Sequence, residues 1–205
     1  MKFKIIHRTF NKDLKFTNKK EILKNVNYFS IRNKAWQFLI DINITSLPLD
    51  LNKVTKMLGL TLARFSKIKH TEIYPHVLNT AGAKVIIENK TYIFVNDALS
   101  YEAQRFTIAH EIGHHYLKND RKPYEVAETE ANMFAARILM PMCIIKELHI
   151  NKISQLMQLC LVSKEAAKFR LKRYNKVIKR NKFYSNPLEK QLVEKFKEFI
   201  KEKLT

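Results

Sequence analysis

The sequence is poor in glycine, proline and cysteine, with three, five and two of them among 205 residues. So little glycine and proline argues against long flexible linkers. No apolar run approaches the roughly 20 residues that a membrane-spanning helix needs, and the first ten residues lack the apolar core of a signal peptide. Cys143 and Cys160 lie in apolar helical patterns, which predicts buried thiols in a reducing compartment. We therefore expect a cytoplasmic protein without a membrane segment.

Acidic residues are also scarce, because 19 Asp and Glu face 38 Lys and Arg and leave a net charge of +19. The excess lies at the ends of the chain. Residues 1–35 carry 10 basic and 2 acidic side chains, residues 36–145 carry 12 and 11, and residues 146–205 carry 16 and 6. Basic segments of this kind contact nucleic acid or acidic partners. A solvated, lysine-rich surface would give the same composition.

The spacing of apolar residues predicts a mainly helical chain with one strand-rich region. A short strand or extended arm is expected near the start, a second strand at 60–65, a loop at 66–80, and a hairpin formed by VIIEN and TYIFV around Asn89-Lys90. Helices are expected at about 28–42, 51–58, 100–117 and 125–139, as three short segments within 142–180, and from Asn186-Pro187 onward. The pattern indicates an α+β fold: a small antiparallel sheet, the 100–117 helix behind it, and a helical C-terminal part.

A candidate metal-binding motif lies in the 100–117 helix, within the run RFTIAHEIGHHYL. His110 and His114 are four residues apart and so project from one helical face. That spacing lets both imidazoles bind one zinc ion. Glu111 is positioned to take a proton from a water that zinc acidifies. A coincidental pair of buried histidines has the same spacing, but this helix is amphipathic and suited to packing on a core.

A catalytic zinc site needs a third protein ligand and an open position. Asp120, six residues beyond His114, is one option. The other option is a glutamate of the next helix, where Glu125, Glu128 and Glu130 lie. We prefer Glu128 because it shares a small, apolar face with Ala131 and Ala135, whereas Glu130 could pair with an arginine. Asn132, one turn after Glu128, is predicted to hydrogen-bond the outer nitrogen of a ligand histidine. For each glutamate the alternative is a solvated helix charge.

These runs resemble the ImmA/IrrE family of metallopeptidases. RFTIAHEIGHHYL followed by ETEANMFAARILMP carries the likeness, and SLPLDLNKVTKMLGL, FVNDALSYEAQRFTIAHE and LVSKEAAKFRLKRYN extend it over roughly residues 35–176. The resemblance implies a zinc site with His110, His114 and Glu128 as ligands, Glu111 as the catalytic residue and Asn132 one turn beyond. It also implies an endopeptidase that cleaves, or triggers cleavage of, a helix-turn-helix transcriptional repressor.

The resemblance suggests three regions: a basic N-terminal extension (1–34) without a counterpart in the family, a zincin-like metallopeptidase domain (35–142) and a basic helical region (143–205). Within the last, residues 154–176 could form a helix-turn-helix-like segment that contacts DNA phosphates through Lys164, Lys168, Arg170, Lys172 and Arg173. A solvated basic face is the alternative.

A second function from another class stays open: a non-catalytic DNA- or regulator-binding protein of a mobile-element or toxin–antitoxin-like system that retains a zinc site. The fourth metal position separates the two functions, because catalysis fails if a protein group fills it. The remaining histidines His7, His70, His76 and His149 are isolated in the sequence and are predicted to be structural.

Overall fold

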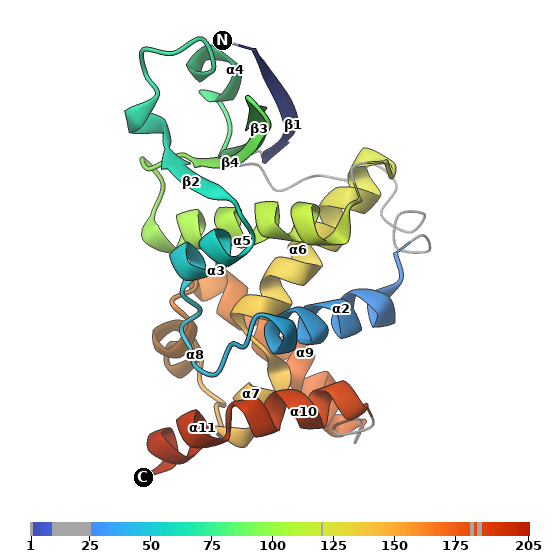
Figure 1. Cartoon of the computed structure of the whole chain (residues 1–205). Helices are drawn as coiled ribbons and strands as arrows, with labels where there is room; N and C mark the ends of the chain where they lie inside the picture. The colour runs from blue at the N-terminus through green and yellow to red at the C-terminus, as the bar shows by residue number, and fades with distance from the viewer. Residues whose placement is uncertain (1, 10–25, 120, 181–182, 184–185) are drawn as a thin grey trace. The chain divides into compact units, whose positions relative to one another are not determined.

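The computed structural model (Figure 1) describes residues 2–9, 26–119, 121–180, 183 and 186–205. Asp120, one of the predicted ligand options, lies outside the described residues. The chain divides into two compact units. Unit 1 comprises residues 1–27 and 51–132, and unit 2 comprises residues 28–50 and 133–205.

Unit 1 combines a four-stranded sheet with helices. Its elements are β1 (Phe3–Thr9), α3 (Leu51–Met57), β2 (Thr61–Arg64), the 3-10 helix η1 (Phe65–Lys67), α4 (Tyr74–Val77), β3 (Gly82–Ile87), β4 (Lys90–Val95), α5 (Tyr101–Leu117) and the first half of α6 (Tyr124–Leu139). The strand order is β1-β3-β4-β2. β3 is antiparallel to both β1 and β4, and β2 joins β4 in parallel. The predicted α+β class is confirmed, and α5 runs along the sheet as expected (Figure 1).

The β3–β4 hairpin forms one wall of the core of unit 1. Val85 and Phe94 are buried, and they belong to a cluster with Val77 of α4. The turn consists of Glu88 and Asn89, both with positive φ (47° and 65°), as a tight two-residue hairpin requires. The predicted turn at Asn89-Lys90 was wrong by one residue, because Lys90 already pairs with Ile87.

Helix α5 begins and ends at recognisable caps. The Ser100 hydroxyl accepts a hydrogen bond from the Ala103 amide at 3.3 Å, which satisfies one of the unpaired donors of the first turn. The helix ends at Lys118, whose φ of 50° is left-handed. The predicted bounds are confirmed. This register places positions 110, 111 and 114 in the buried part of the helix.

Strand β1 lies at the edge of the sheet and carries an irregularity. Its pairing with β3 shifts between Ile5 and His7, so that one extra residue stands on β1. Such a bulge redirects the side chains that follow it. Beyond it, His7 and Thr9 are two residues apart and therefore share one face of the strand. Both side chains contact Glu111 of α5.

Unit 2 is helical. Its elements are α2 (Tyr28–Asp41), the second half of α6, α7 (Met142–Glu147), α8 (Ile153–Cys160), α9 (Lys164–Lys179), α10 (Pro187–Lys195) and α11 (Lys197–Leu204). Phe38 and Phe134 are fully buried and meet edge to face, with ring centroids 5.2 Å apart. Three helices over 142–180 are confirmed, although α9 is 16 residues long rather than short. The single C-terminal helix that we predicted is two, interrupted at Phe196.

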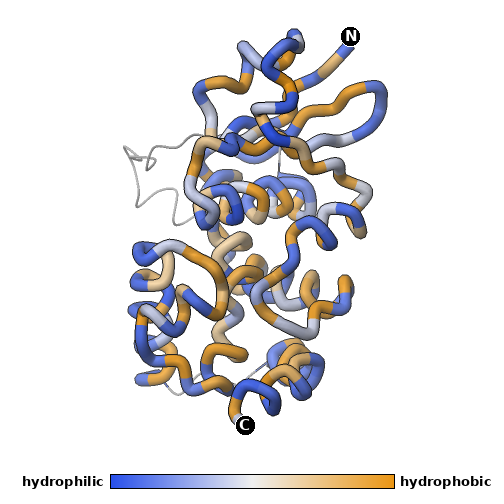
Figure 2. The backbone as a smooth tube through the Cα atoms, turned by 90° about the vertical axis from the view of Figure 1, so that its left-hand side faces the viewer, coloured by the Kyte–Doolittle hydropathy of each residue, from blue (hydrophilic) through white to orange (hydrophobic). Residues whose placement is uncertain are grey.

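Figure 2 shows short hydrophobic and hydrophilic stretches following one another along the helices, as expected for amphipathic segments. Of the described helices, none is both long enough and apolar enough to cross a membrane.

Candidate metal centre

Helices α5 and α6 bring three potential metal ligands together. His110 and His114 of α5 face each other with their Nε2 atoms 3.0 Å apart. Glu128 of α6 places Oε1 2.9 Å from Nε2 of His114 and Oε2 3.6 Å from Nε2 of His110. All three side chains are buried. Tetrahedral zinc with Zn–N distances of about 2.0–2.1 Å holds its donor atoms roughly 3.3 Å apart, so this spacing fits such an ion.

The outer nitrogens of both histidines are hydrogen-bonded to amide oxygens. Nδ1 of His110 donates to Oδ1 of Asn132 at 2.8 Å, and Nδ1 of His114 donates to Oδ1 of Asn119 at 2.9 Å. Because these oxygens only accept, Nδ1 of each neutral ring carries the hydrogen and Nε2 carries the lone pair. Two lone pairs and a carboxylate therefore face one point, which is unfavourable unless a cation lies between them.

The protonation states of the cluster also suit a metal. Burial lowers the pKa of His114, which favours its neutral form. Burial by itself would raise the pKa of Glu128, but the imidazoles of His110, His114 and His7 around its carboxylate hold that pKa well below its usual range. Neutral imidazoles and an ionised carboxylate are the forms that bind zinc.

The sequence analysis, which took His7 to be isolated and structural, did not place it near the metal ligands, but the structure does. From β1, its Nε2 contacts Oε1 of Glu128 and its Nδ1 lies 3.0 Å from Oε1 of Glu111. Its ring centroid lies 3.7 Å from that of His114. One potential donor atom from each of His7, His110, His114 and Glu128 lies within 4.8 Å of the others. The chain thus offers a fourth ligand besides the three expected.

Glu111 is fully buried and held by strand β1. Oε1 accepts a hydrogen bond from the Thr9 hydroxyl at 2.6 Å, and His7 Nδ1 lies within 3.2 Å of both carboxylate oxygens. Burial opposes its charge, but the hydrogen bond and charge of His7 hold the pKa of Glu111 at about 2. Burial likewise disfavours protonated His7, yet its bonds to Glu111 and Glu128 raise the His7 pKa to about 9. Glu111 is therefore an anion whose oxygens are both engaged by its own chain.

The other candidate acids have different surroundings. Glu130 is buried and accepts from Lys122 Nζ at 2.6 Å and from Asn119 Nδ2 at 3.3 Å, so its partner is not an arginine. Asn119 also donates to the Ala127 carbonyl at 3.0 Å, which fixes the orientation of its amide. Glu125 is not among the four potential ligands found in the described residues. Asn119, which no sequence motif indicated, supports His114 as Asn132 supports His110.

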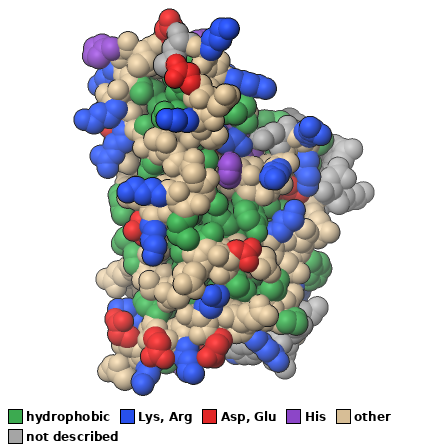
Figure 3. All heavy atoms as spheres, viewed as in Figure 1, with side chains coloured by type: hydrophobic (Ala, Val, Ile, Leu, Met, Phe, Trp, Pro, Cys, Tyr) green, Lys and Arg blue, Asp and Glu red, His purple; other side chains and the backbone are tan. Residues whose placement is uncertain are grey.

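The α8–α9 pair has a tight connection, with Leu161 in the left-handed region (φ 52°) and Ser163 capping α9. Arg170, one of the predicted phosphate contacts, is only 7% exposed, and its Nε donates to the Met140 carbonyl at 2.7 Å. It is therefore not available to a DNA backbone. On the face seen in Figure 3, lysines and arginines are scattered rather than gathered into one patch.

Comparison with known proteins places these residues in a family. The sequence profile Peptidase_M78, described as an IrrE N-terminal-like domain, matches residues 63–172, which is more than half of the chain. The matched segment begins at β2 and ends within α9, so it contains α5 and α6 but not strand β1. No curated protein matches the chain. The profile match shows that this chain belongs to the ImmA/IrrE family of peptidases.

Proposed function

We propose that the protein is a zinc-dependent endopeptidase of the cytoplasm and that its substrate is a helix-turn-helix transcriptional repressor. The main support for a metal site is that the unprotonated Nε2 atoms of His110 and His114 converge on the buried carboxylate of Glu128. These three residues are the proposed ligands. Asn132 and Asn119 orient the two rings. Family membership supports a protein substrate. The repressor is the substrate that the ImmA/IrrE resemblance suggests.

When bound, zinc would polarise the scissile carbonyl and acidify a water molecule. Glu111 is the general base of this proposal: it takes the proton of the attacking water and passes it to the leaving nitrogen. Its place beside His110 in the sequence keeps it next to the ligands, and burial excludes bulk water from its carboxylate.

Strand β1 restricts the access of a water molecule to Glu111. A general base needs a free lone pair within hydrogen-bond reach of the proton that it accepts, and the contacts of Thr9 and His7 take up three of the roughly four acceptor positions of the Glu111 carboxylate. A hollow of about 340 Å³ opens beside His7, lined by Ile5, Ile6, His7, Arg8 and Tyr124. We infer that the arrangement seen here is a closed form of the peptidase and that a substrate displaces β1.

His7 itself favours a second candidate function. If His7 loses its proton to the incoming metal and stays in place as a fourth ligand, the site has no open position and is structural. The protein would then act by binding a regulator or DNA, without cleavage. In that case the metal would link β1 to α5 and α6 through His7 and the other three ligands.

Three variants separate the two functions: Glu111→Gln, His7→Ala, and His70→Ala as a control at an exposed histidine. Each is co-expressed with a helix-turn-helix regulator as the trial substrate, and regulator fragments and bound zinc are measured. The peptidase proposal expects fragments with wild type and His70→Ala, more with His7→Ala, none with Glu111→Gln, and zinc in all four proteins. No fragments with any protein, together with loss of zinc in His7→Ala alone, would establish the structural site instead.

A further inference from the structure

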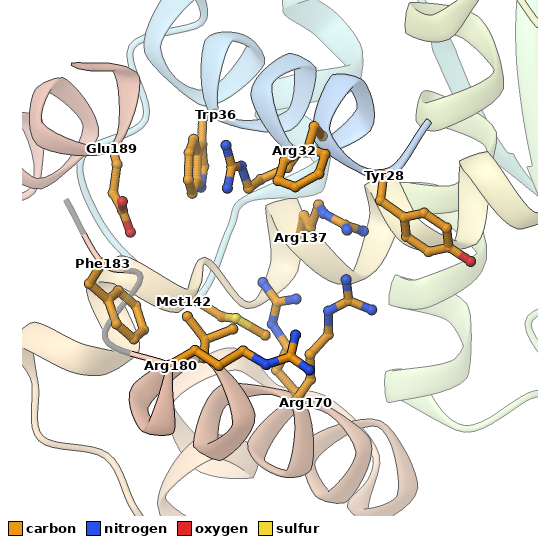
Figure 4. A pocket seen from close by; sticks show the side chains of 12 residues that line it. Tyr28, Arg32, Trp36, Arg137, Met142, Arg170, Arg180, Phe183 and Glu189 are labelled. Atoms are coloured by element: carbon orange, nitrogen blue, oxygen red, sulfur yellow. The ribbon is translucent and has the colours of Figure 1, made fainter. Parts of the chain in front are cut away.

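A second concave site lies within unit 2 and shares no residue with the metal centre. A cavity of about 210 Å³ opens among residues of α2, α6, α7, α9 and α10 (Figure 4). Its most unusual feature is a set of five arginines: Arg32, Arg137, Arg170, Arg173 and Arg180. They come from three helices and the C-cap of α9, so folding gathers them from distant parts of the sequence.

Positive charge in this pocket is crowded and partly buried. Arg137 and Arg170 are each only 7% exposed. Burial first, and neighbouring arginines next, lower the pKa of both guanidinium groups to about 9. Among the described lining residues, Glu189 is the one carboxylate. Buried charges of one sign are costly unless a counter-charge is near. An anion bound in the pocket would therefore reduce the repulsion among these arginines.

The buried guanidinium groups are fixed in position. Arg170 donates through Nε to the Met140 carbonyl, and Arg137 donates through Nη1 to the Met133 carbonyl at 2.8 Å. A guanidinium has five N–H donors in a planar fork, so each such bond uses one and orients the rest. Arg32 is held between two rings, 4.7 Å from the centroid of Trp36 and 5.2 Å from that of Phe29. Figure 4 shows Arg32 and Arg137 on one side of the pocket and Arg170 and Arg180 on the other.

Apolar side chains form the remaining wall of the pocket. Phe29, Met142 and Val177 line it beside the arginines, and Phe29 is 69% exposed. A ligand with an anionic end and a flat or apolar end would satisfy both parts. Planar arginine forks match the oxygens of a phosphate in pairs, and a phosphate can carry two negative charges.

We propose that this pocket binds a small molecule that carries a phosphate group next to an aromatic or apolar group. The cavity is below the roughly 300 Å³ at which pockets for larger ligands begin, which suits a phosphate with a single ring system. A nucleic-acid strand fits less well, because two of the five arginines lie too deep for a continuous backbone to reach. The site is separate from the proposed peptidase centre and does not depend on it.

Calorimetry on the full chain tests this proposal with three probes: inorganic phosphate, phenyl phosphate and adenosine monophosphate. Sodium chloride at matched ionic strength is the control for screening. The variants are Arg173→Gln at the exposed rim and Arg137→Met in the interior. Lys172→Gln removes one positive charge from the neighbouring, exposed position on α9 outside the pocket. A DNA duplex is measured in parallel.

We expect phenyl phosphate, which has a single ring, to bind more tightly than inorganic phosphate and at least as tightly as the larger nucleotide. Both pocket variants should weaken binding by about tenfold or more, and Lys172→Gln should change it little. Arg137→Met should also raise the melting temperature of the ligand-free protein, because it removes a crowded buried charge. Three results would overturn the proposal: no binding of any probe, equal loss in Lys172→Gln, or binding of the duplex alone.

Discussion

Asn119→Ala tests whether the buried amide next to α5 holds a metal ligand in place. Asn119 is 1% exposed, accepts from His114 Nδ1 at 2.9 Å, and donates to the Ala127 carbonyl at 3.0 Å. Alanine leaves His114 without the acceptor that fixes its ring and its tautomer. Loss of such a partner typically lowers metal affinity about 10- to 100-fold, or about 1.4 to 2.8 kcal/mol. The lost hydrogen bonds should also lower the free energy of unfolding by about 1 to 3 kcal/mol.

Zinc affinity is measured by competition with a chromophoric chelator, and stability by urea denaturation of the metal-free protein. Asn132→Ala should weaken zinc binding similarly, because it removes the partner of His110. Asn96→Ala is the matched control: its amide also bonds backbone groups of unit 1, at Thr80 and Ala98, but lies outside the cluster. If Asn119→Ala binds zinc as tightly as Asn96→Ala does, His114 is not a ligand oriented by Asn119.

Three further predictions concern the packing that supports the two units. Gly82→Ala should destabilise the protein by about 1 to 3 kcal/mol in urea, because the new Cβ would lie 2.5 Å from Thr107 Cγ2 and 2.8 Å from the Phe94 carbonyl oxygen; full recovery by Thr107→Ser would contradict this, since the backbone contact remains. Cys143, whose thiol pKa burial raises to about 12, should not react with a disulfide reagent at pH 8 in a Cys160→Ala background until the protein is unfolded. Ser163→Ala should cost about 1 kcal/mol of stability, because it removes the acceptor for the Ala166 amide at the start of α9; an unchanged urea midpoint would show that this cap contributes nothing.

Local patterns in the sequence were sufficient to predict the two helices, α5 and α6, that contain the expected ligands. Helix α5 follows from a serine cap and an amphipathic repeat, and its register fixes the shared face of His110 and His114. Glu128 and Asn132 are one turn apart on α6, so the periodicity that predicts the helix also predicts their common face. Such inferences succeed because helical geometry relates residues three and four positions apart without reference to the rest of the chain.

The contributions of His7 and Asn119 could not be predicted in this way. His7 lies 104 positions before Glu111 and reaches it only because β1 adds to the edge of β3 and a bulge redirects its side chain. Asn119 follows Lys118, whose backbone is in the left-handed region, and so lies after the end of helix α5, where helical spacing no longer applies. Strand pairing and loop conformation both depend on tertiary contacts, and no spacing rule covers them. A lone histidine in a strand therefore gives no sequence signal of a metal site.

The basic composition of the chain likewise did not predict where its charged side chains lie in the folded protein. The surplus charge at both ends of the chain suggested a surface for nucleic acid, yet a surplus says nothing about where the side chains point. In the folded unit 2, Arg32 from the N-terminal part and Arg170 and Arg173 from the C-terminal part line one cavity. Charges on a surface are screened within about 8–10 Å at ordinary salt, whereas charges in a partly buried pocket are screened much less. The arginines that gather there should consequently govern which anion binds, and the scattered surface lysines should mainly set the dependence of binding on salt.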